Sequence, residues 1–224
     1  MLPTIIIDKR IKDVCPNMQV GLIRAKVTNS ETSSELWDEI ERESANIIAN
    51  YELLEINKRP AIAQTRALYR ALGKDPNRYR VASEALCRRV IRGLGLYRID
   101  TLVDLINLIS MKSGYPISGL DADKLIGTTL EMGVGEEGEE YHGIGRGLLN
   151  ISGIPVYRDE IGGVATPTSD EERTKITINT QTVQININGF GLEMPMEEAI
   201  EWSVELLRKY ANATDIETKI INII

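Results

Sequence analysis

The chain has 224 residues, 42% of them hydrophobic, and a formal net charge of −7. It is long enough to bury a substantial core, and we expect one domain. Two cysteines far apart in sequence and a single histidine exclude a disulfide framework and a Cys/His zinc centre, so no metal is expected. No stretch approaches the roughly 20 apolar residues of a membrane helix, and the start is too short in apolar residues for a signal peptide. We therefore expect a cytoplasmic protein without a membrane partner.

The first third of the chain predicts two strands followed by helices. Residues 5–7 and 20–27 are apolar runs separated by Pro-Asn, which is typical of strands on either side of a break. Thr32 and Glu35 form a capping-box pattern ahead of apolar residues at helical spacing, which predicts a helix over 33–53. Two more helices are predicted at 60–73, beginning at a proline, and at 83–93, ending at a glycine.

A fourth helix is predicted over 101–113, where apolar residues occur nearly all round the helix, so it should be central and covered. Asp104 and Asn107 interrupt this apolar surface. Buried polar groups in such a helix usually form hydrogen bonds to neighbouring backbone, so we interpret both residues as structural.

From residue 128 onward the pattern changes to glycines and short alternating runs, which indicate strands. The predicted strands lie at 128–134, 139–145, 154–159, 175–178, 182–189 and 219–224. In 182–189 apolar and polar residues alternate, which predicts a strand with one face in water. A helix is expected over 195–212. Helices cluster first and strands follow, so the predicted fold class is α+β, with N-terminal helices on a mixed or mainly antiparallel sheet.

Basic residues are concentrated between Lys58 and Arg98. This segment holds eleven Lys or Arg and two acids, a local charge of +9 within an acidic chain. Such a face could attract phosphates, although a solvated surface forming ion pairs with the acidic remainder is the plain alternative. Arginines at four-residue spacing favour the first interpretation, because like charges on one helix face repel each other unless an anion neutralises them. The candidate phosphate-binding residues are Arg66, Arg70, Arg88, Arg89 and Arg92.

Several short motifs follow one another in a specific order. They are Leu86–Arg89 (L-x-R-R), Ile99–Thr101, Val103–Asn107 (V-D-x-x-N), Gly114–Pro116, Asp121–Leu125 and, downstream, Asp159 with Thr177, Thr180 and Val183. In this order and spacing the chain resembles the editing domain (B3/B4 type) of the phenylalanyl-tRNA synthetase beta subunit, most closely a free-standing version of it. The resemblance is strongest over 60–190. On this basis we expect two parts: an N-terminal segment, 1–58, whose strands and helix pack on the main domain, and the editing-like domain, 59–224.

The resemblance implies a tRNA-directed protein without a cofactor that hydrolyses mischarged aminoacyl-tRNA in trans. It does not imply a complete phenylalanine-tRNA ligase, because the chain has no room for that catalytic subunit. The expected partner is aminoacylated tRNA, with a small amino-acid ligand as an option and no DNA. The alternatives are a binding module for RNA or an amino acid without turnover, and a protein-interaction domain with an acidic partner.

The family's loop acid corresponds to Glu172, which the resemblance implies as the catalytic candidate, orienting a water or recognising the substrate. Ser118 and Thr180 are the expected pocket residues. Two departures put the pocket's shape in doubt: Ser118 stands where the synthetase carries histidine, and Asp170 and Glu171 replace a glycine pair. His142, the single histidine, has no nucleophile beside it in sequence, so a half-exposed strand position is its simpler interpretation.

Overall fold

The computed structural model describes residues 1–223, and Ile224 lies outside the described residues. The helices are α1 (Lys9–Val14), α2 (Ser34–Asn50), α3 (Pro60–Ala71), α4 (Ala82–Ile91), α5 (Thr101–Ser113) and α6 (Met196–Ala211). The strands are β1 (Thr4–Ile7), β2 (Gln19–Lys26), β3 (Ile117–Asp121), β4 (Thr129–Val134), β5 (His142–Gly143), β6 (Gly147–Leu148), β7 (Pro155–Arg158), β8 (Gly163–Ala165), β9 (Thr182–Gly189) and β10 (Thr214–Asn222). Short 3-10 helices are η1 (Ile56–Lys58), η2 (Ala122–Lys124) and η3 (Glu172–Thr174).

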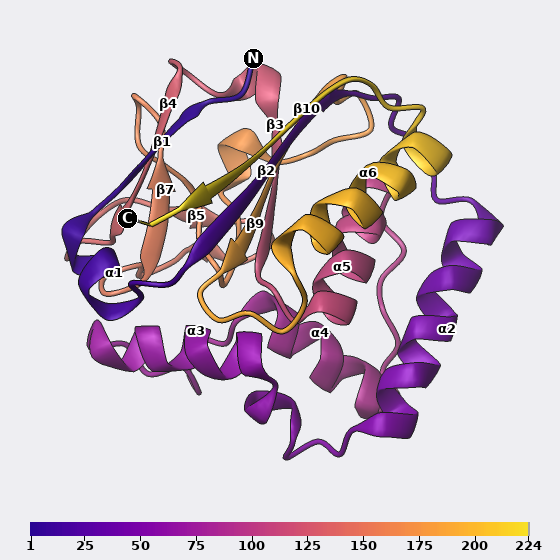
Figure 1. Cartoon of the computed structure of the whole chain (residues 1–224), viewed down its shortest axis with the longest axis horizontal. Coiled ribbons are helices and arrows are strands. Elements are labelled where there is room, and N and C mark those ends of the chain that lie inside the picture. Colours follow the sequence, from indigo (N-terminus) through magenta and orange to yellow (C-terminus); the bar gives the residue numbers. More distant parts are fainter. Residues whose placement is uncertain (224) are drawn as a thin grey trace.

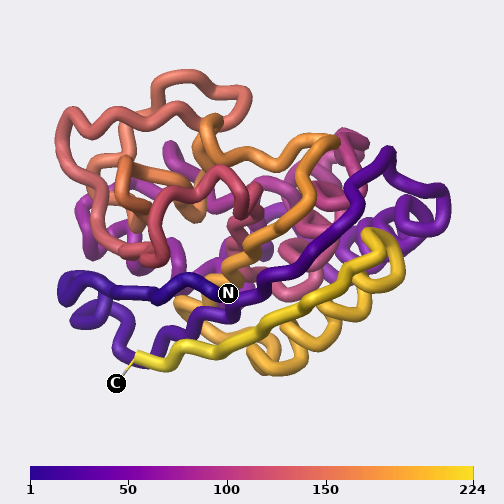
Figure 2. Tube along the Cα trace, turned by 90° about the horizontal axis from the view of Figure 1, so that it is seen from above, coloured from indigo at the N-terminus to yellow at the C-terminus, as the bar shows by residue number. Residues whose placement is uncertain are grey.

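The strands form two four-stranded sheets and a small hairpin. One sheet has the order β1-β4-β7-β8, in which only the β1–β4 pair is parallel. The other, β10-β2-β9-β3, is antiparallel throughout, and β5 pairs with β6. The N-terminal strands are built into both sheets, and β10 runs along the outside of β2 (Figure 2). The fold is α+β, as predicted.

The antiparallel sheet lies between helices and the second sheet (Figure 1). On one side, Ile23, Val183 and Ile185 pack with α2, α4, α5 and α6 in the larger apolar core. On the other side, Val20 and Leu22 pack against residues of the β4-β7-β8 layer in a second core. Burial on both faces fixes this sheet as the centre of the molecule.

The five predicted helices are confirmed within one to three residues, and local chemistry explains their ends. Pro60 starts α3, where its missing N–H is not needed. The Asp100 side chain accepts a hydrogen bond from the Val103 amide and caps α5, which ends at Gly114 with φ of +74°. The cap of α2 is Ser33, not the predicted Thr32, because the Thr32 hydroxyl donates to Asp104 instead.

The prediction of a water-facing side for 182–189 is wrong. All eight residues of β9 are buried, including Gln184, Asn186 and Asn188. The polar side chains face inward and bond there: Tyr157 Oη donates to Asn188 Oδ1 over 2.7 Å, and Gln184 Nε2 donates to Asn186 Oδ1 over 2.8 Å. Period-two alternation identified the two faces of the strand, but the second sheet covers the face that was expected to be wet.

Three other sequence interpretations change. Residues 175–178, expected as a strand, form one isolated bridge from Lys175 to Leu120 and a turn closed by Thr180. Helix α1 and strand β3 were not predicted, because α1 has six residues and β3 lies between two motifs interpreted as turns. The predicted strand at 219–224 begins earlier, at Thr214, and its last residue is not described.

Candidate functional site

A cavity of about 380 Å³ lies where α5, β3 and the start of α4 meet the segment 166–176. Apolar side chains form much of its wall: Ile99, Val103, Ile106, Ile117, Ile144 and Ile176. Polar residues also line it: Asn107, Thr166, Ser169, Asp170 and Lys175. A mainly apolar hollow with a few convergent polar groups is the usual form of a small-molecule site.

Asp170 is the ionisable group that the surroundings perturb most in this cavity. Burial raises the pKa of its carboxyl to about 7, against hydrogen bonds from the Gly119 amide and the Ser118 hydroxyl that lower it. The Gly119 N–H donates to Asp170 Oδ2 over 3.0 Å. At neutral pH this carboxyl therefore exchanges a proton readily, which suits a general acid or base.

Glycine at position 119 leaves room for the isoleucine side chains of the cavity wall. A Cβ there would lie 2.3 Å from Ile106 Cδ1 and 3.0 Å from Ile176 Cδ1, so a larger residue would have to displace them. Gly119 thus keeps the hollow open while its backbone amide holds the carboxylate.

The turn that carries Asp170 is held by one of its own side chains and by two tyrosines from outside it. The Thr166 hydroxyl donates to the Ser169 carbonyl over 2.8 Å and accepts from the Ser169 amide over 3.1 Å. Tyr141 Oη donates to the same carbonyl over 2.7 Å, and Tyr69 Oη lies 2.9 Å from the Thr168 hydroxyl. Both tyrosines are buried, so the turn is fixed against the core and not left as a surface loop.

Glu172, the catalytic candidate of the sequence, lies at the start of η3 with its side chain 46% exposed. It is not among the residues around the cavity, but its Oε1 is paired with Lys175 Nζ, and Lys175 is. Glu172 therefore contacts the cavity only indirectly, through its ion pair with Lys175. Ser118 is buried and is not among the residues that line the cavity, although its hydroxyl is one of the groups that lower the pKa of Asp170.

The two polar residues of α5 have different surroundings. Asp104 is buried and accepts hydrogen bonds from the Thr32 hydroxyl and from the Ile99 amide, at 3.2 Å for each carboxylate oxygen. It thus ties α5 to the residues before α2 and to the preceding loop. Asn107 is half-buried and lines the cavity, so it belongs to the candidate site rather than to that scaffold.

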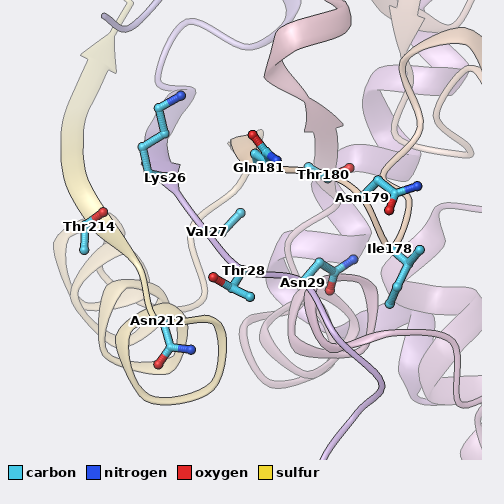
Figure 3. Close-up of a pocket in the computed structure, with 10 residues that line it drawn as sticks. All are labelled: Lys26, Val27, Thr28, Asn29, Ile178, Asn179, Thr180, Gln181, Asn212 and Thr214. Atoms are coloured by element: carbon cyan, nitrogen blue, oxygen red, sulfur yellow. The ribbon is translucent and has the colours of Figure 1, made fainter.

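A wider depression of about 510 Å³ lies beside the ends of β2 and α6 and the loop 178–181 (Figure 3). Thr180 lines it, with its hydroxyl donating to Asp121 over 3.0 Å. The Asn29 side chain also forms hydrogen bonds within the protein: it donates to the Thr177 carbonyl and accepts from the Leu102 amide. Because these polar groups hold the fold together, this depression is the weaker candidate for a site.

Two of the five candidate arginines, Arg66 and Arg88, bind groups within the protein. Arg66, only 4% exposed, forms an ion pair with buried Glu84 over 2.8 Å and donates to the Pro76 carbonyl and to Asn77. The expectation that Arg66 lies on a phosphate-binding face is therefore corrected, because its charge is neutralised inside. Arg88 is half-buried, 3.8 Å from Glu84, and donates to the Leu53 carbonyl over 2.9 Å.

The other three candidates lie nearer to water. Arg70 and Arg92 are exposed, at the C-terminal ends of α3 and α4 respectively. Arg89 is half-buried and donates from Nε to the Gly95 carbonyl over 2.6 Å, with its guanidinium 4.1 Å from the Tyr97 ring centre. The arginines thus do not form one continuous face.

Sequence reasoning did not select Asp170 as a site residue. The sequence does mark the position, since Asp170 and Glu171 replace the glycine pair of the synthetase pattern before Glu172, but this marks only a departure from the pattern. Its position in the cavity depends on the Ala165–Asp170 bridge and on contact with β3, 51 residues earlier in the chain. Neither is visible in a local sequence window.

Two other residues considered from the sequence, His142 and Asp159, have surroundings typical of a surface or a structural residue. His142 is exposed on β5, with Nε2 3.1 Å from Glu140 Oε1. Asp159 forms a two-pronged pair with Arg173 at 2.9 and 3.0 Å and accepts from three backbone amides, so its role is to hold loops together. Residues 1–223 contain no cluster of three or more potential metal ligands, and none of their helices is long and apolar enough to cross a membrane.

Comparison with known proteins places the chain in a family. The profile of the family described as the B3/4 domain matches residues 64–201, well over half of the chain. A solved structure of an N-terminal fragment of the phenylalanyl-tRNA synthetase beta subunit from Pyrococcus horikoshii is similar at 14% identity and a TM-score of 0.46. That similarity covers 97% of this chain and 50% of the fragment, so the chain spans half of the fragment's length. No curated protein matches the chain. The resemblance expected from the sequence is confirmed, and the chain belongs to the B3/4 domain family.

Proposed function

We propose that this protein binds the aminoacylated end of tRNA and hydrolyses the ester that joins the amino acid to the terminal ribose. The observation that carries this proposal is the Asp170 carboxyl, with a pKa raised to about 7, in the wall of a mainly apolar cavity. The tRNA part of the proposal is supported by the sequence resemblance and by the exposed arginine at the end of α4.

The chemistry follows from the cavity. The apolar wall accommodates the amino-acid side chain, while Asn107, Lys175 and Asp170 contact the ester and the α-amino group. Ionised Asp170 accepts a proton from a water molecule as that water attacks the ester carbonyl. The carbon–oxygen bond to the ribose then breaks, and the ribose oxygen takes the proton. The products are the free amino acid and the uncharged tRNA.

A second function is favoured by the same carboxyl. The Gly119 amide holds the Asp170 carboxylate, and a carboxylate held at a cavity wall is also a receptor for an α-ammonium group. In that case the protein binds an amino acid or an aminoacyl-tRNA without turnover. The departure from histidine at Ser118 is consistent with this alternative.

Three consecutive acids provide a matched test of the site. Asp170 lines the cavity, Glu171 caps η3 through the Arg173 amide, and Glu172 is exposed and paired with Lys175. Single-turnover deacylation of a panel of misacylated tRNAs should slow by about 100-fold or more in Asp170→Asn, a typical loss for a general base. Glu171→Gln serves as the control and should keep the parent rate.

Glu172→Gln separates the sequence-based candidate from the cavity carboxyl. A loss of turnover with tRNA affinity retained would support a role for Glu172 through Lys175, whereas parent activity would remove it from the site. If no tRNA in the panel is deacylated but Asp170→Asn weakens amino-acid or aminoacyl-tRNA binding, the binding module is supported. Parent rates in Asp170→Asn would overturn the assignment of this cavity as the hydrolytic site.

A further inference from the structure

The connection between α4 and α5 exposes an unusual amount of apolar surface. Leu94, Tyr97 and Ile99 are 58%, 68% and 58% exposed, three large side chains within six residues. The connection turns at Gly93 and Gly95, both at positive φ, where other residues would be strained. Several large apolar side chains exposed within one short loop are a feature of binding surfaces.

Arg89 gives this loop a defined shape. Its Nε donates to the Gly95 carbonyl over 2.6 Å and its Nη2 to the Leu94 carbonyl over 3.3 Å, both backbone atoms of the loop. Its guanidinium lies 4.1 Å from the centre of the Tyr97 ring, so a cation is held against the aromatic system. Tyr97 nevertheless keeps most of its surface in water, and the ring is available to a flat partner.

The loop is continuous with the cavity. Ile99 belongs to both, since it ends the exposed run and also lines the hollow. On α4, Ala82 lines the hollow, and Arg89 follows it by seven residues, so both lie on one face of the helix about 10 Å apart. The cavity and the loop are therefore neighbours, joined by Ile99 and by this face of α4.

The charge around the loop selects the partner. Arg92 is exposed at the end of α4, close in sequence to the loop, in a chain whose net charge is −7. Arg98 follows Tyr97, but its guanidinium donates to the Thr32 carbonyl and lies over the Trp37 ring, so the cations beside Tyr97 are Arg89 and Arg92. Local positive charge beside an open aromatic ring is the combination that holds single-stranded nucleic acid, in which bases stack on the ring and cations contact phosphates. An acidic protein segment would use the same charges but has no need of the exposed ring.

We propose that the loop 94–99 binds the unpaired 3′ end of RNA, with a base stacked on Tyr97 and phosphates held by Arg89 and Arg92, while the ester enters the cavity past Ile99. This inference deepens the proposed function and rests on it for the position of the ester. It adds a positioning residue, Tyr97, that takes no part in bond breaking.

The direct test is the affinity for a fluorescent single-stranded RNA ending in CCA, measured by anisotropy. Tyr97→Ala should weaken binding by about tenfold, and Tyr97→Phe, which keeps the ring, should restore most of it. Ile48→Ala removes a 54% exposed apolar side chain on α2 and should have no effect. Unchanged affinity in Tyr97→Ala, or displacement of the RNA by an equal concentration of a poly-glutamate peptide, would overturn the proposal.

A kinetic test separates this inference from the proposed function. On a misacylated tRNA, Tyr97→Ala should raise KM about tenfold with little change in kcat, and on a simple amino-acid ester without a nucleotide it should match the parent. A fall in kcat on both substrates would show that Tyr97 supports the cavity and would overturn the RNA role. If the parent hydrolyses neither substrate, the proposed function fails, and the anisotropy result alone decides the binding of RNA by the loop.

Discussion

Asp170 illustrates how one side chain acquires a property that its sequence neighbours lack. Three acids follow one another, but only Asp170 is turned toward β3, where burial raises the pKa of its carboxyl and the Gly119 amide accounts for part of the opposing effect. Glu172, two residues later, is exposed to water and paired with Lys175. The difference in environment, rather than in residue type, separates a candidate base from a surface acid.

Asp170 should make the protein less stable as the pH rises. Its pKa is about 7 when folded and near 3.8 when unfolded. Between these values the folded state alone retains the proton, so the free energy of unfolding falls as pH increases and levels off above about 7. The total decrease in the free energy of unfolding that Asp170 causes is at most about 4 kcal/mol. It is smaller to the extent that water reaches the half-buried carboxyl.

Urea unfolding between pH 4.5 and 8 measures this effect. In Asp170→Asn the free energy of unfolding should decrease less with rising pH. This variant should be more stable than the parent at pH 8, because it has no carboxylate charge to bury. The control is Glu172→Gln, which should follow the parent curve. A parent-like pH dependence in Asp170→Asn would show that Asp170 does not titrate in this range.

Among the elements, the junction of α3 and α4 depends on a buried acid. Glu84 is 1% exposed and lies 2.8 Å from Arg66, 3.5 Å from Arg80 and 3.8 Å from Arg88. The like charges at four-residue spacing on α4 are therefore offset by an acid within the same helix. This arrangement explains the repeated arginines of the sequence without an external polyanion at Arg66.

Removal of this acid should loosen the junction. Glu84→Ala leaves the Arg66 guanidinium buried without its carboxylate, which costs about 3–5 kcal/mol because an uncompensated charge is left inside. Chemical denaturation measures the loss. Glu201→Ala, an exposed position on α6, is the control and should change the free energy of unfolding by less than about 0.5 kcal/mol. An equal midpoint for Glu84→Ala and the parent would show that water reaches Arg66 and replaces the acid.

At the scale of the whole molecule, the electrostatic question is which cations remain available to a polyanion. Arg66 is paired with buried Glu84, and Arg88 donates to the Leu53 carbonyl. We therefore expect tRNA binding to depend on the end of α4 rather than on a broad face of α3 and α4. Affinity for tRNA should fall steeply with salt, because phosphate contacts release counterions.

Charge reversal at single arginines tests this distribution. Arg92→Glu should weaken binding and lower the slope of log K against log salt by about 1, the change expected for one lost phosphate contact. Arg208→Glu changes the net charge equally at an exposed position on α6 and should leave the slope unchanged. Filter binding between 50 and 200 mM salt measures both. Equal slopes in the parent and Arg92→Glu would exclude the end of α4 from the RNA contact.

Local sequence patterns were sufficient for the five longer helices, the α+β class and the family. Helical periodicity, the proline at the start of α3 and the glycine after α5 are local signals, and a local signal is enough to define a helix because its hydrogen bonds are local. The ordered motifs from Leu86 to Val183 were sufficient for the family resemblance.

The tertiary structure alone decided which surfaces meet water. Alternation separated the two faces of β9, but the second sheet, built from distant segments, buried its polar face. The same holds for the site: contact between residues 119 and 170 makes Asp170 a cavity carboxyl, and Glu84 takes Arg66 out of the basic surface. Burial and charge pairing depend on residues far apart in the chain, and for that reason no local pattern determines them.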